Sequence, residues 1–465
     1  MDHEGNGVSD WTLASLVRDT GAELLRWGPG PFRGVSTDSR RIAAGEVFVA
    51  LVGTRHDGHA YVPTAVAAGA TAVVASRSDV DLPEGSAWLQ VGDTLESFGD
   101  LASAYRRALA TRVVAVTGSN GKTTTKEMIA SVLAASGASI AKNVGTENNL
   151  VGVPQTLLRL GGEERYAVVE MGMNHPGEIW RLTEIARPDV GVITNVGPAH
   201  LEGLGTLANV AAAKGELALA MPAGSTLVVN GSDPWLVPLA ASFPGRTIQT
   251  GENGPVRAIA AEPLEGQAQL LSLEIDGRTV DARLGCVGAH NVANALLAAA
   301  VGTAFGMDAA TIAEGLERFE PPPMRLELVR LANGACLWND VYNANPASIE
   351  AALTALAAEP AKRRVVVVGE MWELGEEEAK YHREVGRRVA ELGLDLLLAV
   401  GRLADEVAAG ARDGGLPSER VERFDAPAAA AARLRAMLRE GDVVLVKGSR
   451  GARMEEVVTR LRGSG

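Results

Sequence analysis

The chain has 465 residues, which is too long for a single hydrophobic core, so about three domains are expected. Its net charge of -13, with no block of Lys and Arg, argues against nucleic acid as a partner. No apolar run approaches the roughly 20 residues that span a bilayer, and the start lacks a secretory pattern, so no membrane insertion and a cytoplasmic location are expected. Cys286 and Cys336 have neither metal nor disulfide spacing and are predicted to be free thiols.

The first 110 residues predict a small α/β domain. Short β-type runs occupy residues 46–51 and 71–75, and a helical run lies between them at 62–68.

From residue 112 the pattern changes to short, β-branched runs that are apolar on both faces. These runs, at 112–117, 166–172 and 189–197, favour a parallel sheet covered by helices on each side. Helical patterns follow at 207–220 and from 290 to about 305. The sequence therefore predicts a central domain at 111–322.

The proline run at 321–323 cannot continue a helix and predicts a linker. Residues 326–342 then predict a hairpin that turns at Asn333-Gly334. Helical and strand patterns alternate afterwards, with strands at 363–370, 394–401 and 442–449, an alanine-rich helix at 426–432 and a final helix from about 451. A third domain at 323–465 with its own sheet is expected, which makes the fold class α/β with three domains.

The segment GSNGKTT, residues 118–124, joins the strand at 112–117 to a helical pattern. Such a turn gathers backbone N–H groups at the positive end of a helix dipole, Lys122 adds a cation, and Thr123 offers a hydroxyl for Mg²⁺. Gly118 stands only three positions before Gly121, whereas the usual phosphate loop is Gly-x4-Gly-Lys-Thr/Ser. A glycine-rich turn with a solvated lysine is the alternative.

Two further predicted strands end in polar residues. Glu170 ends the run at 166–170, and His200 follows the run at 189–197. Ligands collect at the carboxyl ends of strands in open α/β sheets, and a carboxylate there suits Mg²⁺. Glu170 could instead cap a helix or form a salt bridge, and His200 alone could equally be a structural histidine at a turn.

Three other groups stay ambiguous by pattern alone. Lys214 lies in an apolar helical stretch, where most lysines are solvated. Asn291 and Asn294, spaced i, i+3 at a helix start, could bind a base or sugar or could cap the helix. The turn LVKGSRG, with Lys447, Ser449 and Arg450, predicts an anion site or a surface turn with two solvated cations.

Taken together, these residues resemble the Mur ligases, the ATP-dependent amide-forming enzymes of bacterial cell-wall precursor synthesis. GSNGKTT is similar to that family's own phosphate loop, which has the shorter glycine spacing. The resemblance covers nearly the whole chain and implies a uridine-nucleotide-binding N-terminal domain, a central ATPase domain and a Rossmann-like C-terminal domain. Segments ENNLVGVPQTLL, EMGMNHPGEI, NVGPAHLEGLG, DVYNANPASI and GEMWELGEEEAKYH resemble the branch that joins D-alanyl-D-alanine to UDP-N-acetylmuramoyl-tripeptide.

The resemblance implies roles for individual residues. It implies that ATP is held by Gly118, Ser119, Asn120, Gly121, Lys122, Thr123, Thr124, Asn291, Asn294, Arg325, Asp340 and Tyr342. Mg²⁺ is implied at Thr123, Glu170, His200 and a carbamoylated Lys214, and catalytic roles at Lys122, His200, Lys214 and Arg325. The two substrates are implied at Ser36, Thr37, Asp38, Ser39, Arg40, Asn148, Asn149, Lys447, Ser449 and Arg450.

Two other functions remain open at this point. One is a sister ligase that adds a single amino acid to a muramoyl peptide or glutamate to a folate, and the other is a nucleotide-binding protein without catalysis. The chain departs from the branch pattern at Thr146, usually asparagine, and at Glu370, usually aspartate. A monomer is expected.

Overall fold

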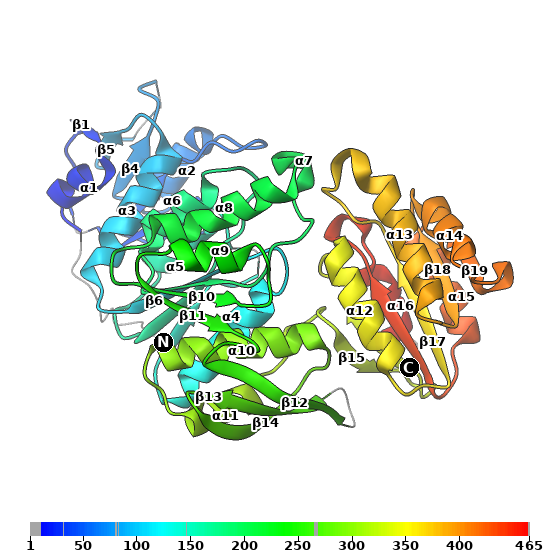
Figure 1. Ribbon diagram of the computed structural model, residues 1–465. Helices are drawn as coiled ribbons and strands as arrows, with labels where there is room; N and C mark the ends of the chain where they lie inside the picture. Colours follow the sequence, from blue (N-terminus) through cyan, green and yellow to red (C-terminus); the bar gives the residue numbers. More distant parts are fainter. Residues whose placement is uncertain are drawn as a thin grey trace.

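The computed structural model describes residues 11–30, 32–79, 81, 83–145, 147–264 and 268–463, and Thr146 lies outside this set. The described chain forms three separate β-sheets, each with its own helices, in the order N-terminal, central and C-terminal unit (Figure 1). This arrangement confirms the predicted three-domain α/β class.

The N-terminal unit is built on a five-stranded sheet in the order β1-β5-β4-β3-β2. Only β1 runs antiparallel to its neighbour. The strands and helix expected at 46–51, 71–75 and 62–68 are present as β3, β4 and α2. The elements are α1 Leu13–Thr20, β1 Glu23–Arg26, β2 Gly34–Ser36, β3 Glu46–Val49, η1 Gly58–Tyr61, α2 Val62–Ala67, β4 Ala72–Ala75, β5 Ala87–Gln90 and α3 Thr94–Ala108.

The central unit has a nine-stranded sheet in the order β14-β13-β12-β11-β10-β9-β6-β8-β7. The three strands predicted from apolar runs are β6, β8 and β9, which lie side by side and parallel, so their carboxyl ends share one edge. Their strands and the nearby helices are β6 Arg112–Thr117, α4 Lys122–Ala135, β7 Ile140–Lys142, α5 Gly152–Leu158, β8 Tyr166–Glu170, α6 Glu178–Ala186, β9 Val190–Ile193, α7 Leu201–Leu204 and α8 Leu207–Ala220.

Helices cover both faces of this sheet. Residues of α4 such as Met128 and Val132 pack with Leu297 of α10 (Ala289–Ala304) in one buried cluster. Residues of α5, α6 and α8 pack in a second cluster on the other face. This two-sided cover explains why the strands between the clusters are apolar on both faces.

The sheet extends through three antiparallel strands, β12 to β14, which the sequence pattern did not predict. Outward positions of β14 carry Arg278, Asp281 and Arg283, so no apolar run marks the strand. The remaining central elements are β10 Thr226–Asn230, α9 Leu236–Ser242, β11 Arg246–Thr250, β12 Val256–Leu264, β13 Ala268–Ile275, β14 Arg278–Leu284, α10 Ala289–Ala304 and α11 Ala309–Glu317.

The C-terminal unit has a six-stranded sheet in the order β15-β16-β20-β17-β18-β19. The predicted hairpin is β15–β16, and Gly334 at its turn has φ 81°. The last helix begins at Glu455, later than expected, because a 3-10 turn occupies Arg450–Ala452. The elements are β15 Glu327–Arg330, β16 Cys336–Asp340, α12 Pro346–Ala358, β17 Arg363–Val368, η2 Gly375–Glu377, α13 Glu378–Glu391, β18 Leu396–Val400, α14 Ala404–Asp413, η3 Ser418–Arg420, β19 Val421–Phe424, α15 Pro427–Met437, β20 Asp442–Lys447, η4 Arg450–Ala452 and α16 Glu455–Arg462.

Both cysteines are free thiols, as predicted. Burial raises the pKa of Cys286 to about 12 and also raises the pKa of Cys336. Among the described residues no helix is long and apolar enough to cross a membrane.

Candidate active site

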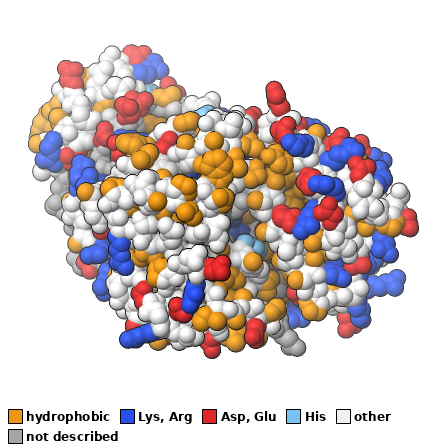
Figure 2. Space-filling view, viewed as in Figure 1, with side chains coloured by type: hydrophobic (Ala, Val, Ile, Leu, Met, Phe, Trp, Pro, Cys, Tyr) orange, Lys and Arg blue, Asp and Glu red, His pale blue; other side chains and the backbone are white. Residues whose placement is uncertain are grey.

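A cleft of about 1320 Å³ lies where the central unit meets the C-terminal unit. The same region is hollowed in the space-filling view (Figure 2). Its walls include the loop at residues 119–124, the ends of β8 and β9, the start of α10, and the C-terminal turn at 449–451. The predicted phosphate loop and most of the predicted ATP residues therefore face one cavity.

Two glycines of the phosphate loop hold conformations that side chains rarely adopt. Gly118 has φ 146°, and a Cβ there would lie 1.9 Å from Thr194 Oγ1; Gly121 has φ 79°, and its Cβ would lie 2.5 Å from Asn294 Oδ1. Both positions need glycine because of close neighbours as well as backbone conformation. Gly121 is the N-cap of α4, so the first turn of this helix, with its free backbone N–H groups, lines the cleft.

The residues that follow β9 hold the phosphate loop in place through hydrogen bonds. Asn195 accepts from the Asn120 N–H at 2.9 Å and donates to the Asn120 carbonyl at 3.0 Å, and Thr194 donates to the same carbonyl at 2.5 Å. Ser119 Oγ donates to the Gly197 carbonyl and accepts from its N–H, each at 2.9 Å. Hydrogen bonds within the protein thus organise the loop.

Lys122 is partly buried at the start of α4, and its Nζ donates to the carbonyls of Gly118 at 2.8 Å and Ser119 at 3.3 Å. Burial lowers the pKa of Lys122, while the nearby Glu170 carboxylate acts in the opposite direction. Among the described residues the hydrogen-bond acceptors of this ammonium are neutral carbonyls, and a phosphate would be a much stronger partner.

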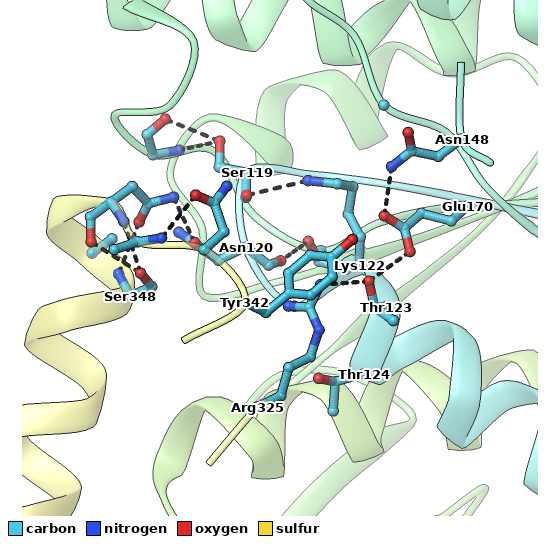
Figure 3. A pocket seen from close by; sticks show the side chains of 18 of the residues that line it. Ser119, Asn120, Lys122, Thr123, Thr124, Asn148, Glu170, Arg325, Tyr342 and Ser348 are labelled. Carbon is cyan, nitrogen blue, oxygen red and sulfur yellow. Dashed lines mark hydrogen bonds between the residues drawn. The ribbon is translucent and has the colours of Figure 1, made fainter. Parts of the chain in front are cut away.

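Thr123 connects two units of the molecule. Its hydroxyl donates to Glu170 Oε2 at 2.7 Å and accepts from Arg325 Nη2 at 2.8 Å. Figure 3 shows Thr123 between the Glu170 carboxylate and the Arg325 guanidinium. The predicted metal pair and the arginine from beyond the linker are therefore in direct contact.

Glu170 is buried, and its carboxylate and its backbone groups all form hydrogen bonds. Asn148 donates to its second carboxylate oxygen at 2.9 Å, and Asn143 bonds to both its backbone N–H and its carbonyl. Lys126, itself buried, donates to the Asn143 carbonyl at 2.8 Å. These contacts contradict the helix-capping alternative for Glu170. The Asn149 side-chain oxygen accepts from the N–H groups of residues 151 and 152, just before and at the start of α5.

Arg325 reaches the phosphate loop in a fixed orientation. Its guanidinium lies over the Tyr342 ring, with Cζ 4.1 Å from the ring centroid, which is a cation–π contact (Figure 3). The flanking residues Met324 and Leu326 both have positive φ, 61° and 51°. Asn345, at the start of α12, adds a second bridge by donating to Asn120 Oδ1 at 2.8 Å.

Asn291 and Asn294 lie buried on α10 beside Gly121. Asn291 Nδ2 donates to the Val287 carbonyl, and Asn294 donates to Asn291 and accepts from Thr125. The N-cap of α10 is Gly288, so the capping alternative is wrong. Both residues line the cleft.

Lys214 is buried in α8 with 1 % exposure, so the solvated-surface alternative is wrong. Burial and the nearby Lys122 cation lower its pKa well below the ordinary value. His200 is the N-cap of α7, with φ 57°, and its Nδ1 lies 2.8 Å from Glu373 Oε2, although the two groups are not aligned as a hydrogen bond. This contact lowers the pKa of Glu373.

The turn LVKGSRG, the predicted anion site, lines the cleft. Lys447 is buried and donates to Asp340 Oδ2 at 2.6 Å, and Ser449 Oγ donates to the Ala344 carbonyl while accepting from the Trp372 N–H. Both side chains are therefore engaged within the C-terminal unit, which contradicts the solvated-cation alternative at Lys447. Arg450 is exposed, and its guanidinium nitrogen lies 3.6 Å from the Met324 sulfur.

Residues 36–40 lie away from this cleft, in the N-terminal unit. Asp38 forms a two-point ion pair with the exposed Arg40, and this contact lowers the pKa of Asp38 to about 2. Ser36 donates to the Asp38 carbonyl, Ser39 is buried, and Thr37 Oγ1 accepts from Gln155 of α5 at 2.7 Å. The segment thus touches the central unit through Thr37.

The residues around Thr123 fit Mg²⁺. No group of three or more His, Cys, Asp or Glu that could hold an ion occurs in the described part of the chain. Mg²⁺ does not need such a group, since it binds through one or two carboxylates together with water and substrate phosphates. A buried carboxylate beside a hydroxyl at a phosphate loop meets this requirement.

Several contacts were not assigned from sequence. Asn195, Asn345 and Glu373 lie inside segments that carried the family resemblance, so a signal existed. Asn143 and Lys126 gave none, because an asparagine after a short edge strand and a lysine on a helix are unremarkable until their burial is known.

Family comparisons agree with this geometry. Residues 116–302 match the Mur ligase middle domain, 324–450 the Mur ligase glutamate ligase domain, and 31–106 the Mur ligase family catalytic domain. The UDP-N-acetylmuramoyl-tripeptide--D-alanyl-D-alanine ligase of Escherichia coli K12 is 39% identical over 93% of this chain and 94% of its own length.

Solved structures give the same result. MurF from Acinetobacter baumannii superposes with a TM-score of 0.90 at 32% identity, covering 98% of this chain and 99% of that one. MurF ligase from Thermotoga maritima in complex with ADP has a TM-score of 0.84 at 29% identity and covers 92% and 97%. The chain belongs to the Mur ligase family and, within it, to the MurF branch.

Proposed function

We propose that the protein joins D-alanyl-D-alanine to UDP-N-acetylmuramoyl-tripeptide at the expense of ATP, making the pentapeptide precursor of peptidoglycan. The relatives that carry this activity in their names cover nearly the whole chain. The observation that carries the proposal is the Thr123 hydroxyl, which joins Glu170 of the central unit to Arg325 of the C-terminal unit.

The chemistry requires an activated carboxylate. The terminal phosphoryl group of ATP passes to the carboxylate of the tripeptide, giving an acyl phosphate and ADP. The amine of D-alanyl-D-alanine then attacks the acyl carbon, the C–O bond to phosphate breaks, and amide, inorganic phosphate and a proton are released. A water molecule would compete with the amine, so closure of the cleft favours ligation.

We assign the positive groups of the cleft to the transferred phosphoryl. Lys122 and the N–H groups at the start of α4 would bind the phosphates, and Arg325 would neutralise charge that spreads onto them during transfer. The stacking of Arg325 on Tyr342 keeps the guanidinium oriented. Asn291 and Asn294 are assigned to the adenine side, with Asp340 and Tyr342 close to the nucleotide.

We further propose that Thr123 and Glu170 hold Mg²⁺, which would neutralise phosphate charge when bound. His200 is proposed near a second ion. Lys214 is proposed to carry CO₂ as a carbamate, because a buried lysine with a lowered pKa and a cationic neighbour is stabilised by conversion to an anion.

For the substrates, we propose Ser36–Arg40 as the uridine-nucleotide segment, with Asn148 and Asn149 on the path to the tripeptide. Arg450 is the proposed contact for the free carboxylate of D-alanyl-D-alanine. Lys447 and Ser449, given their internal bonds, are proposed to shape that site.

Domain limits are proposed at 1–110, 111–322 and 323–465. The protein is proposed to be a monomer and to work in the cytoplasm, where ATP is available.

Phosphate release with each substrate omitted in turn tests the function. We expect release only with ATP, UDP-N-acetylmuramoyl-tripeptide and D-alanyl-D-alanine together. Equal activity with a single amino acid would favour a sister ligase, and no release under any combination would favour a binding protein without catalysis.

A further inference from the structure

The loop between β17 and α13 reaches across the cleft to the central unit. Its Glu373 Oε2 lies 2.8 Å from His200 Nδ1, and its Glu373 carbonyl accepts from the Glu202 N–H at 3.2 Å. In Figure 1 α7, which begins after His200, faces this part of the C-terminal unit. One residue therefore makes a side-chain and a backbone contact between two units.

Both residues of the side-chain contact have left-handed backbone conformations, with φ 57° at His200 and φ 65° at Glu373. Such a conformation is strained for a non-glycine residue and persists only where neighbouring contacts impose it. Four of the described non-glycine residues with positive φ line the cleft, namely His200, Met324, Leu326 and Glu373. Backbone strain is thus concentrated where the two units meet.

The C-terminal unit holds Glu373 in place. The N–H of Met371 donates to His382 Nε2 at 2.9 Å, while His382 Nδ1 lies 2.7 Å from the Glu378 carbonyl, so the buried ring is neutral with its proton on Nδ1. The N–H of Trp372 donates to Ser449 at 3.0 Å, and Leu374 is buried. Glu373 consequently moves with the C-terminal unit.

Glu373 Oε2 lies 2.8 Å from His200 Nδ1 without being aligned as a hydrogen bond, so the carboxylate acts on the ring by charge attraction. That attraction favours a proton on Nδ1 and biases the direction of the ring, which leaves the other nitrogen for a ligand. We propose that Glu373 is a positioning residue for the ligation reaction, which orients the His200 ring and does so only while the C-terminal unit is docked on the central unit. The proposal rests on the function proposed above.

The proposal connects the two halves of the reaction. Ser449, which holds the Trp372 N–H, follows β20 beside Arg450, the proposed contact for the acceptor carboxylate. Binding of the acceptor substrate in the C-terminal unit would therefore stabilise the loop that orients His200 in the central unit. The His200 ring is therefore oriented for the reaction only while the C-terminal unit, which would bind the amine substrate, is docked on the central unit.

Nitrogen-15 NMR of histidine-labelled full-length protein tests the contact without substrate. The His200 resonance is assigned from the spectrum of His200→Ala. We expect Glu373→Ala to shift the His200 ring signals toward a mixture of tautomers, and Glu373→Gln, which keeps an acceptor oxygen, to shift them less. Glu376→Gln, an exposed change three residues along the same loop, serves as the control and should leave them unchanged.

A double-mutant cycle on phosphate release tests the role. We expect Glu373→Ala to lower kcat about tenfold with an unchanged KM for the UDP substrate, and to have no further effect in the His200→Ala background. Additive losses, or unaltered His200 signals in Glu373→Ala, would overturn the proposal. If the wild type releases phosphate without needing both substrates, the proposed function fails, whereas the NMR result still decides the contact.

Discussion

At the scale of single residues, burial changes what several side chains can do. Lys214 would be an ordinary surface lysine by pattern, yet it lies buried beside a second cation. A buried unpaired ammonium is costly, and loss of the proton or reaction with CO₂ relieves that cost.

Lys214→Ala should therefore lose at least about a hundredfold in kcat, because an anion is missing beside the phosphate loop. Formate or acetate should restore part of the activity by occupying the vacated space. Steady-state phosphate release with and without the acids measures this, with Lys122→Ala as a control that acids should not rescue. Full activity of Lys214→Ala would rule out a carbamate role.

His290, at the start of α10, should stay neutral in mildly acidic solution. Burial lowers its pKa to about 4, so between about pH 6.5 and 4 the unfolded chain binds a proton there and the folded chain does not. Its contribution to stability is complete above pH 6.5 and is lost as the pH falls toward 4. Thermal unfolding from pH 7 to 4 should show a shallower decline for His290→Gln than for the wild type. Parallel curves would contradict the lowered pKa.

At the scale of elements, α5 links two proposed substrate regions. Its Gln155 donates to Thr37 in the N-terminal unit, and Asn148, just before it, donates to Glu170. The seven-residue helix contacts the proposed uridine-nucleotide segment, and the loop just before it contacts the proposed metal carboxylate.

Gln155→Ala should raise the KM for UDP-N-acetylmuramoyl-tripeptide roughly fivefold while leaving the KM for ATP unchanged, since one hydrogen bond contributes about 1 kcal/mol. Initial-rate measurements with each substrate varied in turn provide the check. Thr37→Val is the matched partner, and combining the two changes should cost no more than either alone. A larger effect on ATP than on the UDP substrate would refute this link.

The sequence predicted most of the helices and strands that have a strong hydrophobic pattern. The buried strands β6, β8 and β9 and the helices α8 and α10 were expected within a few residues, because burial on both faces leaves an unmistakable apolar run. β12 to β14 escaped because half of their side chains face water. The contact of Asn143 with Glu170 and the pairing of Lys447 with Asp340 were not predicted, because only the fold decides which polar groups come into contact.

At the scale of the whole molecule, the two nucleotides are assigned to different units. The proposed uridine-nucleotide segment belongs to the first sheet, while the phosphate loop follows β6 of the second. Loss of one nucleotide site should leave the other intact.

Lys122→Ala should accordingly abolish turnover while binding UDP-N-acetylmuramoyl-tripeptide within about twofold of the wild type. Calorimetric titration of each nucleotide into the variant measures the two affinities separately. Collapse of both affinities together would show that the proposed division between the units is wrong.

The two cysteines have a practical consequence. A thiol reacts as its thiolate, and a pKa of about 12 keeps Cys286 protonated at neutral pH even though it lines the cleft. The raised pKa of Cys336 acts in the same direction. Maleimide dyes should therefore label cysteines introduced at exposed sites on either side of the cleft far faster than the native ones. The natural chain, with no cysteine removed, is suited to fluorescence measurements of how often the cleft opens during turnover.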